Sequence, residues 1–583
     1  MNSEYLTNLR HSTAHLLAAA VLKLYPEAKN TIGPAIEDKF YYDFDFGNIK
    51  LTEDDLPRIE SEMHSIIKTW SGFERHNISL DEALNEFSNN EYKVELIKDI
   101  SSKGEEISIY QSGNFRDLCR GGHVSNPSQE IKFFKLLSVA GAYWRGDENN
   151  KMLTRIYGTA FDTQEGLNLY LNNLEEAKKR DHRKIGRELE LFYFDEEIGK
   201  GLPIWLPKGN IIKEELENWA KKTEKDWGYE RVTTPVITKE NLFYTSGHLP
   251  LYKESMYAPI EIEGENYYLK PMNCPFHHKV FASKIRSYKE LPLRVAEYGL
   301  CHRYEDSGSL FGLMRVRGME MNDAHIYCSY EDAVSEFVKV IKLHEYYYQA
   351  LGIKEYHMEL ALRDPKNMDK YHGSEEDWAL AEKMTKEAME LSGVPYTVVN
   401  EGAAFYGPKM DFQIKSVTGR TFTASTNQLD LYAGKKFKLK FTDKDGSEKT
   451  PVVIHRAPLG THERFIGFLI EQFAGAFPVW MSPTQVMIIP ISEKFEDYSN
   501  EIYNMLKNSD IRVSIDKRNE SLGARVRDAQ NEKTPYMAII GQKEAESDTV
   551  TIRKRNSKEL ITISKDEFLK LILSKIESKS LDL

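Results

Sequence analysis

RVAEYGLCHRYE at residues 294–305 and MEMNDAHIYC at residues 319–328, joined by the loop DSGSLFGLMRVRG at 306–318, decide the fold. Both outer runs are short, rich in strand-forming residues and bounded by turn residues, which is typical of strands. The sequence therefore predicts an antiparallel pair of strands around a loop that is rich in Gly and Arg. Such a loop is able to close over a polyanion.

The predicted strands place polar side chains on common faces. Because alternate residues of a strand point to the same side, Arg303 shares a face with Glu305, and Met321 shares one with Asp323 and His325. The planar fork of Arg suits phosphate, and a carboxylate accepts from an amine such as that of adenine. From the hairpin alone, a solvated charged face is the more common explanation of such strand residues.

A second decisive stretch is VVIHRAPLGTHERFIGFLIEQF, at residues 452–473. Its pattern predicts a strand, a Gly turn and a helix that is capped by Thr461. Arg464 falls in the first helical turn, where a cation opposes the helix dipole. An anionic partner such as phosphate accounts for this placement, and a surface salt bridge is the alternative.

Outward from these stretches, strand-like runs between residues 187 and 482 predict an α+β domain with an antiparallel sheet. Residues 483–583 alternate apolar strands with helical stretches, which is typical of a small α/β domain. A chain of 583 residues is also too long for one hydrophobic core. The fold class expected is therefore a multidomain α+β and α/β protein.

The N-terminal part, residues 1–162, opens with a helical pattern in HSTAHLLAAAVLKLY and continues with mixed strands and turns. This predicts a separate α+β domain. Residues 163–186 carry an apolar stripe and a charged run, which predicts a connecting helix, and Asp162 with Glu165 fits a capping box at its start.

Composition points to a globular protein without a membrane span. The sequence has 41% hydrophobic and 29% charged residues, and its polar start lacks the apolar segment of a secretory signal. The four cysteines, which do not form a compact motif, argue against a disulfide framework and favour the cytoplasm; they are Cys119, Cys274, Cys301 and Cys328. A net charge of −12 weighs against a nucleic-acid partner, but a large enzyme can confine its basic surface to one region.

The motifs carry a family resemblance. RYED at 303–306 resembles the second signature motif of class II aminoacyl-tRNA synthetases, GTHERF at 460–465 the third, and VTTPVI with Pro235 the first. Longer blocks are similar to threonyl-tRNA synthetases, in that family's order; they are KPMNCP, SGSLFGLMRVRG, DAHIYC, AFYGPKMDF, IHRAPLG and ARVRDAQNEKTPYM. The resemblance extends from the first residues to the C-terminal domain. The segments 1–162, 163–186, 187–482 and 483–583 are then expected to be an editing domain, a linker helix, the catalytic domain and an anticodon-binding domain.

The resemblance implies specific roles in the catalytic domain. Arg303 and Arg464 would hold ATP phosphates, with Mg²⁺ accompanying the ATP, and Glu305 would lie near adenine. It also implies one zinc ion per subunit and a substrate pocket around it. The implied zinc ligands are Cys274, His325 and His455, and the implied pocket residues are Asp323 at the substrate hydroxyl, Tyr406 near its amino group, and Lys409, Thr426 and Gln428.

A zinc ion would let the pocket distinguish threonine from valine. Three protein ligands leave an open position, which is the pattern of a working zinc. Valine is nearly isosteric with threonine, and an apolar pocket separates such a pair by only about 100-fold. A metal that coordinates both the amino group and the hydroxyl rejects valine. Read without the resemblance, single buried Cys and His residues are ordinary core residues.

The sequence also departs from the family. Met321 stands where the family has Gln, and it cannot make polar contacts with a carboxylate; Phe276 stands where the family has Gly. Two further blocks differ, AST at 424–426 and SGHL at 246–249. Many relatives have a ubiquitin-like domain ahead of the HSTAH motif, and this sequence is expected to function without it.

Serine is not excluded by such a zinc site, because losing one methyl costs only about 1–3 kcal/mol. The N-terminal residues offer a second cluster, with His11 and His15 one helical turn apart and Cys119 close to His123. From residue types alone, these fit either a zinc site or a polar helix face beside a turn. The resemblance implies instead an editing centre that hydrolyses seryl-tRNA, with His11 or Lys93 as general base. Its other residues are Tyr42 and Asp117.

In the C-terminal domain the resemblance implies that Asn519, Glu544 and Arg553 face the anticodon, although exposed polar residues of this kind also form ordinary solvated surfaces. The partners implied are threonine tRNA, ATP, threonine and a second copy of the chain. Two alternatives remain open. One is a class II synthetase for another amino acid, such as proline or serine, and the other is a non-catalytic RNA-binding regulator.

Overall fold

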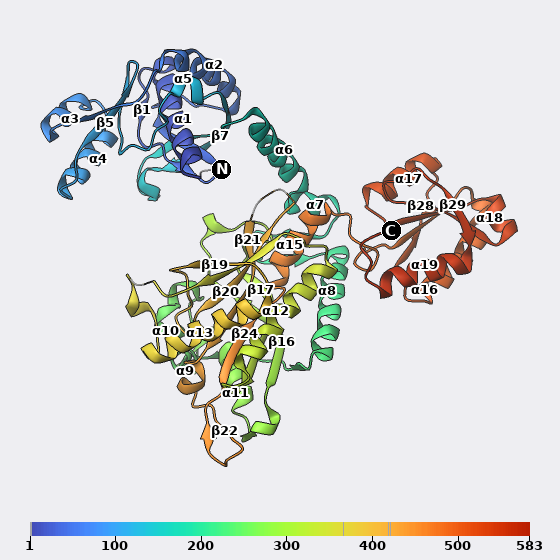
Figure 1. The fold of residues 1–583 in the computed structure, drawn as a ribbon. Coiled ribbons are helices and arrows are strands. Elements are labelled where there is room, and N and C mark those ends of the chain that lie inside the picture. Colours follow the sequence, from blue (N-terminus) through green and yellow to red (C-terminus); the bar gives the residue numbers. More distant parts are fainter. Residues whose placement is uncertain (1–2, 365, 418, 420) are drawn as a thin grey trace. The chain divides into compact units, whose positions relative to one another are not determined.

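The computed structural model describes residues 3–364, 366–417, 419 and 421–583. They form two compact units, Met1–Glu175 and Glu176–Leu583 (Figure 1). No helix among the described residues is long and apolar enough to cross a membrane. The predicted domain boundaries at 162, 186 and 482 are finer than this division and stay predictions.

The N-terminal unit has the predicted α+β character. Helix α1 (Ser3–Leu24) lays Leu17 and Val21 against aromatic residues of the neighbouring sheet, such as Phe40. That sheet has the order β1-β3-β8-β7, with β2 paired to β3, and a second sheet has the order β4-β5-β6. The strands are β1 (Lys29–Asn30), β2 (Ala35–Ile36), β3 (Lys39–Asp45), β4 (Glu74–Asn77), β5 (Ser108–Ser112), β6 (Phe115–Leu118), β7 (Phe133–Tyr143) and β8 (Met152–Phe161). The other helices are α2 (Leu56–Ile66), α3 (Leu80–Glu86), α4 (Glu91–Ser102) and α5 (Pro127–Glu130).

The predicted connecting helix is present as α6 (Gln164–Arg180), followed by α7 (His182–Glu188). The predicted capping box at Asp162 and Glu165 is wrong by one position. Thr163 is the cap, because its hydroxyl accepts from the backbone N–H of Gly166 at 3.1 Å. Both Asp and Thr are favourable caps, so composition alone did not separate them.

An eight-stranded sheet dominates the second unit, in the order β11-β16-β17-β24-β21-β20-β18-β19. The predicted hairpin forms its centre, with β16 antiparallel to β17. Only the outermost pairs differ from the antiparallel prediction, since β11 runs parallel to β16 and β19 runs parallel to β18. The strands are β11 (Glu230–Arg231), β16 (Leu293–His302), β17 (Gly318–Cys328), β18 (Tyr356–Ala361), β19 (Tyr396–Val399), β20 (Lys409–Lys415), β21 (Thr421–Asp430) and β24 (Val452–Arg456).

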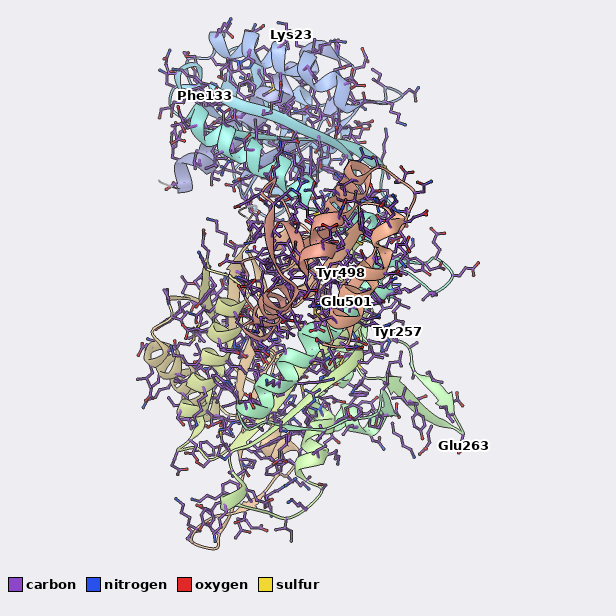
Figure 2. All side chains as sticks on the ribbon, turned by 90° about the vertical axis from the view of Figure 1, so that its right-hand side faces the viewer. Lys23, Phe133, Tyr257, Glu263, Tyr498 and Glu501 are labelled. Atoms are coloured by element: carbon purple, nitrogen blue, oxygen red, sulfur yellow. The ribbon has the colours of Figure 1, made fainter. Side chains whose placement is uncertain are left out.

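Helices pack against this sheet to form its core. Apolar side chains of α8 (Pro207–Asp226), α12 (Ala333–Ala350), α13 (Glu375–Ser392) and α15 (His462–Phe473) join those of the strands in one cluster. Short elements surround the sheet, and Glu263 lies at the tip of the β13–β14 hairpin (Figure 2). They are β9 (Phe192–Phe194), β10 (Pro203–Trp205), β12 (Ile237–Lys239), α9 (Glu240–Ser246), α10 (His248–Leu251), β13 (Ile260–Ile262), β14 (Glu265–Leu269), α11 (Cys274–Phe281), β15 (Arg286–Ser287), α14 (Ala433–Lys436), β22 (Phe441–Thr442) and β23 (Glu448–Lys449).

The C-terminal residues form a five-stranded sheet in the order β26-β25-β27-β28-β29. The predicted βαβ rhythm holds for three strands, since β25 is parallel to both β26 and β27, while β28 and β29 add an antiparallel hairpin. The strands are β25 (Val486–Pro490), β26 (Val513–Ile515), β27 (Tyr536–Ile540), β28 (Thr549–Lys554) and β29 (Ile561–Ser564). The helices are α16 (Glu496–Lys507), α17 (Leu522–Asn531), α18 (Gln542–Ser547) and α19 (Lys565–Glu577).

Candidate active site and its surroundings

A cleft of about 560 Å³ opens over the central strands of the large sheet. It gathers the predicted ATP, substrate and metal residues, apart from His325, which lies directly behind its lining. The predicted residues in its wall are Cys274, Arg303, Glu305, Asp323, Tyr406, Lys409, Thr426, Gln428, His455 and Arg464. Residues separated by as many as 190 positions in the chain therefore share one cleft.

The hairpin orients its polar residues as the strand pattern predicted. Gly299 lies opposite Met321 in the register of β16 and β17. A side chain at Gly299 would collide with Asn273, because a Cβ there would lie 2.1 Å from the Asn273 Oδ1. This close approach lets Asn273 donate from Nδ2 to the Asp323 carboxylate at 3.1 Å. Asp323 is thereby fixed in the cleft wall.

The turn between β24 and α15 sets the position of Arg464. Gly460 has φ +56°, and a Cβ at this residue would lie 2.7 Å from the Ala424 carbonyl oxygen, so the turn requires glycine. The predicted cap is confirmed, since the Thr461 hydroxyl accepts from the Arg464 backbone N–H at 3.4 Å. The Arg464 guanidinium in turn donates to the Met314 carbonyl at 3.1 Å.

Three guanidinium groups, those of Arg303, Arg315 and Arg464, line the cleft, with Glu305 as a carboxylate beside them. Desolvation by surrounding protein, followed by the charges of Arg303 and Arg315, lowers the pKa of Arg464. Arg315 also pairs with Glu305 at 2.8 Å. Clustered cations of this kind favour the binding of a polyanion.

Cys274, His325 and His455 meet at one end of the cleft. Their ligand atoms all lie within 4.8 Å of one another. His325 and His455 are direct cross-strand neighbours on β17 and β24, and Cys274 begins α11. The buried His325 Nε2 and His455 Nδ1 have no hydrogen-bond partner among the described residues. One thiol and two unpartnered imidazole nitrogens fit a zinc ion with an open position.

The remaining predicted pocket residues are already connected by hydrogen bonds. The Tyr406 hydroxyl donates to Gln428 at 3.0 Å. Asp411 accepts from the Thr426 hydroxyl at 2.6 Å and pairs with the Lys409 ammonium at 2.8 Å. These contacts hold the side chains in place before any ligand binds.

The departures from the family lie in different surroundings. Met321 lines the cleft, and its sulfur lies 3.7 Å from a guanidinium nitrogen of Arg303. Phe276 instead packs in a small apolar cluster with Phe243 and Leu249. Ser425 in the altered AST block is buried and bonded to the Tyr348 hydroxyl at 3.0 Å. Of the first two, only Met321 changes the chemistry of the cleft wall.

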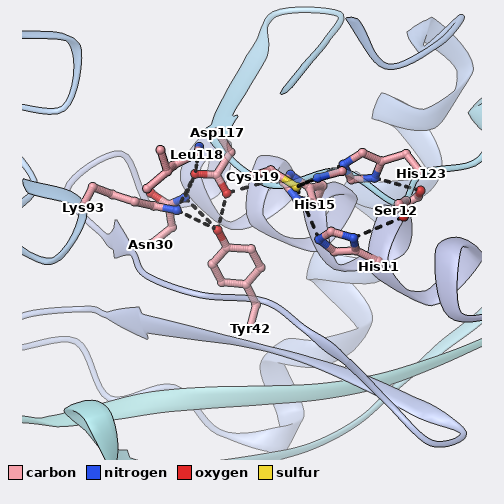
Figure 3. Close-up of polar contacts among 12 residues, drawn as sticks. His11, Ser12, His15, Asn30, Tyr42, Lys93, Asp117, Leu118, Cys119 and His123 are labelled. Atoms are coloured by element: carbon pink, nitrogen blue, oxygen red, sulfur yellow. Dashed lines mark hydrogen bonds and ion pairs between the residues drawn. The ribbon is translucent and has the colours of Figure 1, made fainter. Parts of the chain in front are cut away.

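In the N-terminal unit a separate pocket of about 580 Å³ is lined by His11, His15, Tyr42, Lys93, Asp117 and Cys119. Figure 3 shows Tyr42 and Lys93 gathered at Asp117, and Cys119 between His11 and His123. Lys93 pairs with Asp117 at 2.5 Å. The Cys119 sulfur lies 3.6 Å from the His11 Nε2 and 3.3 Å from the His123 Nε2.

Burial sets the protonation of this cluster. It raises the pKa of the Cys119 thiol to about 11, and it lowers the pKa of His11 and that of His123, the latter to about 2. At neutral pH the thiol is therefore protonated and the imidazoles are neutral. A solvated polar helix face does not describe such residues, whereas the 4.8 Å spacing of the His11, His15, Cys119 and His123 ligand atoms is also compatible with a metal.

The three predicted anticodon residues lie on the C-terminal sheet and its loops. Asn519 is exposed after β26, and Arg553 is half-buried on β28, where it donates to the Ser557 carbonyl at 2.6 Å. The Glu544 carboxylate is already bonded to the Thr551 hydroxyl at 2.7 Å and to the Gly541 N–H at 2.8 Å. Their contact with RNA stays a prediction.

Sequence reasoning missed several residues that organise the catalytic cleft. Arg315 was seen only as part of a basic loop, and Asn273 only as part of a matching block. His277 and Glu297, which contact each other at 3.1 Å behind His325, and Asp430 beside His455 carried no sequence motif. The doubled histidine in NCPFHH was the single feature that could have suggested His277.

Family models match three parts of the chain. Residues 257–473 match the tRNA synthetase class II core domain (G, H, P, S and T), and residues 485–575 match an anticodon binding domain. Residues 107–157 match the threonyl and alanyl tRNA synthetase second additional domain. The second and third matches fall on the C-terminal sheet and on the unit that holds the histidine cluster.

Similar proteins agree with these models. A threonine–tRNA ligase of Geobacillus kaustophilus is 48% identical over 579 residues, which is 99% of this chain and 88% of that protein. One from Staphylococcus aureus is 46% identical over 581 residues, covering 99% and 90%. Among solved structures, the RNA binding domain of threonyl-tRNA synthetase from Cryptosporidium parvum Iowa II has a TM-score of 0.65 at 33% identity, covering 68% of this chain and 98% of that one. The chain therefore belongs to the threonine–tRNA ligase family of class II aminoacyl-tRNA synthetases.

Proposed function

We propose that this chain activates threonine with ATP to threonyl-adenylate and pyrophosphate, and transfers threonine to the 3′ end of threonine tRNA. The observation that carries the proposal is the single cleft in which three arginines adjoin the Cys274, His325 and His455 group. The arginines suit a nucleoside triphosphate, and the metal-ligand group suits an amino acid with a β-hydroxyl. Retention of both speaks against a non-catalytic RNA-binding regulator.

Within this reaction, Arg303 and Arg464 act as catalytic residues on the ATP phosphates, and Glu305 accepts from the adenine amine. Positioning and charge stabilisation account for most of the rate enhancement in transfer at phosphorus. Arg464 is suited to this because it lines the cleft together with Arg303 and Arg315, whose charges act on it. Mg²⁺ accompanies the bound ATP.

One zinc ion per subunit is held by Cys274, His325 and His455. When bound, it supplies a Lewis-acid position for the amino group and hydroxyl of threonine. Asp323 receives the hydroxyl and Tyr406 lies at the amino group, while Lys409, Thr426 and Gln428 complete the pocket. The unpartnered imidazole nitrogens support this assignment, and proline, which lacks the hydroxyl, is disfavoured as the substrate.

Editing of seryl-tRNA is assigned to the pocket of the N-terminal unit. His11 is the general base that activates water, because its imidazole is neutral at physiological pH and lines the pocket. The Lys93 ammonium, held by Asp117, donates to the developing oxyanion. Tyr42, His15, Cys119 and His123 position these groups without a metal.

Other assignments follow from family membership. Asn519, Glu544 and Arg553 read the anticodon, the chain acts as a homodimer in the cytoplasm, and the domains divide near residues 162, 186 and 482. The exposed edge strand β11, close to Pro235, supports a subunit interface there. Four free cysteines support a reducing compartment.

The decisive experiment is aminoacylation with purified protein, threonine tRNA, ATP and labelled amino acids. Stable charging with threonine is expected, together with ATP–pyrophosphate exchange that threonine drives and that proline and valine do not. Exchange driven by proline alone would assign the chain to another amino acid, and tRNA binding without any exchange would make it a regulator.

A further inference from the structure

Behind the zinc ligands lies a buried chain of hydrogen bonds that the catalytic assignment does not use. The His277 Nδ1 lies 2.7 Å from the His325 Nδ1, and the His277 Nε2 lies 3.1 Å from the Glu297 Oε2. His277 and His325 are fully buried, and Glu297 is 3% exposed. The side chains that connect the Glu297 carboxylate to the zinc ligand His325 are therefore shielded from solvent.

Glu297 is anchored so that it can only accept. Its Oε1 takes the backbone N–H of Thr234 at 2.6 Å, its Oε2 takes the Thr234 hydroxyl at 2.8 Å, and the Lys270 ammonium lies 3.6 Å away. An ionised carboxylate has no proton to donate. The bond to His277 must therefore run from the imidazole Nε2–H to Glu297.

The positions of the protons on Glu297 and His277 then determine the tautomer of His325. In its neutral form His277 carries one N–H, which the bond to Glu297 places on Nε2, so that form presents an unprotonated Nδ1 to His325. Two unprotonated nitrogens cannot bond to each other, and the short contact requires that the His325 Nδ1 donates. The lone pair of His325 is left on Nε2, the atom that has no partner among the described residues.

His455 has an equivalent partner in Asp430. The Asp430 Oδ1 takes the backbone N–H groups of Tyr432 at 2.7 Å and Ala433 at 2.8 Å, and its Oδ2 lies 3.0 Å from the His455 Nε2. The His455 Nε2–H therefore donates to Asp430. Its lone pair is left on Nδ1, which again has no partner among the described residues.

We propose that Glu297, acting through His277, and Asp430, acting directly, are positioning residues that select the metal-binding tautomers of His325 and His455. The inference rests on the zinc assignment made above. Partners of this kind fix ring orientation and tautomer, and their loss weakens metal binding by about 10–100-fold. Thr234 lies beside Pro235 in the first signature motif, so the chain of bonds also joins that segment to the metal ligands.

Glu297→Gln and Asp430→Asn test the proposal because each replaces one carboxylate oxygen by an NH₂ group, and the surroundings determine which oxygen is replaced. Backbone N–H groups keep the amide oxygen on their side, so the new NH₂ faces the histidine. An NH₂ group at this place donates a hydrogen bond, so the histidine nitrogen that faces it must be unprotonated. The imidazole proton then moves to the metal-binding nitrogen, which is Nε2 of His325 or Nδ1 of His455. We expect each variant to bind zinc about 10–100-fold more weakly, measured by competition with a chromophoric chelator.

Glu336→Gln is the matched control, since Glu336 is a 1% exposed carboxylate bonded to Arg294 at 2.8 Å, and it lies on α12, which carries none of the metal ligands. It is expected to lose stability and to keep the zinc affinity of the wild type. An amide variant that keeps this affinity within threefold, or a control that loses as much, overturns the proposal. Should Glu297→Gln fail to fold, Asp430→Asn decides by the same criterion. Failure of the wild type to bind zinc would instead reject the zinc assignment itself.

Discussion

The thioether sulfur of Met321 lies 3.7 Å from a guanidinium nitrogen of Arg303, so a weak acceptor occupies the cleft wall beside an arginine proposed to hold phosphate. The family resemblance implies Gln at this position, a side chain that both donates and accepts hydrogen bonds. Met321 fills the same space and offers no donor to a carboxylate. We therefore expect the carboxylate of the bound amino acid to be held more weakly than it would be with Gln at this position.

Met321→Gln is expected to lower the threonine KM in ATP–pyrophosphate exchange by about tenfold, because a hydrogen bond to a charged group contributes about 1.5–3 kcal/mol. Met321→Leu is the control, since it keeps about the same volume and removes the thioether without adding a polar group. It should leave KM unchanged. An unaltered KM in Met321→Gln would mean that this position does not contact the carboxylate.

The cluster of arginines predicts a loss of activation rather than of folding. Arg303→Ala and Arg464→Ala should each reduce threonine-dependent exchange by at least about 100-fold, because each removes charge stabilisation from the transition state. Arg518→Ala replaces an exposed, ion-paired arginine of the C-terminal domain and should leave exchange intact. Exchange at the wild-type rate in either cleft variant removes that arginine from the ATP site.

The open ligand set predicts one zinc per chain. Cys274→Ser should lose both the metal and threonine activation, since a serine hydroxyl is a poor zinc ligand at neutral pH. Cys328→Ser replaces a buried thiol on the same strand as His325 and should keep the metal despite some loss of stability. Elemental analysis checks both, and a full zinc content in Cys274→Ser contradicts the assignment.

The sequence predicted features that depend on neighbours along the chain. Alternation along a strand placed Met321 and Asp323 on the cleft face, and the cap at Thr461 needed only the next three residues. The error at Asp162 has the same local origin, because Thr163 is an equally good cap one position later. Local rules therefore identify elements and faces well and element boundaries less well.

The contacts that hold the site together were not accessible from the sequence. His277 and His325 are 48 residues apart, and Thr234 and Glu297 are 63 apart. These pairs meet only because β16, β17 and β24 are adjacent and α11 packs beside them. No periodicity encodes such a meeting. Even the zinc ligands required family resemblance, since Cys274 and His455 form no compact motif.

Glu463 predicts a pH dependence of stability. Burial raises its pKa to about 7, and its carboxyl group accepts from the Glu320 backbone N–H at 3.0 Å. A carboxyl group whose pKa is raised in the folded state stabilises the folded state when it is protonated. This stabilisation is fully present at a pH below the pKa of the unfolded state, near 4.5. This contribution, on the order of 3 kcal/mol, is lost as pH rises from about 4.5 to about 7.

Glu463→Gln should remove this loss. The melting temperature of the variant, compared with that of the wild type at each pH, is expected to improve steadily between pH 5 and pH 7 and then to level off. Glu320→Gln, at the neighbouring and less buried carboxylate whose charge also raises the pKa of Glu463, should reduce the loss only in part. A constant difference between wild type and Glu463→Gln across this range contradicts the raised pKa.

A need for proofreading is predicted because the zinc pocket cannot fully distinguish serine from threonine. Threonine and serine both present an amino group and a hydroxyl to a metal, so discrimination falls to one methyl, worth about 1–3 kcal/mol, and some seryl-tRNA must form. The pocket of the N-terminal unit is then required to hydrolyse it. Zinc analysis of the wild type bears on this as well, because two equivalents per chain would place a metal among His11, His15, Cys119 and His123.

His11→Ala and Cys119→Ala should leave threonylation intact while seryl-tRNA accumulates. His11 is the proposed base, and Cys119, a protonated thiol 3.6 Å from the His11 Nε2, is expected only to hold that imidazole in place, so the His11 variant should have the larger effect. His76→Ala, at a half-exposed histidine of the same unit that does not line the pocket, is the control and should edit normally. The ester is followed directly by charging tRNA with serine using the His11 variant and then adding intact enzyme. Rapid hydrolysis is expected, and survival of the ester would end the editing hypothesis. A purely structural role for His11 would appear differently, as a lowered melting temperature without accumulation of seryl-tRNA.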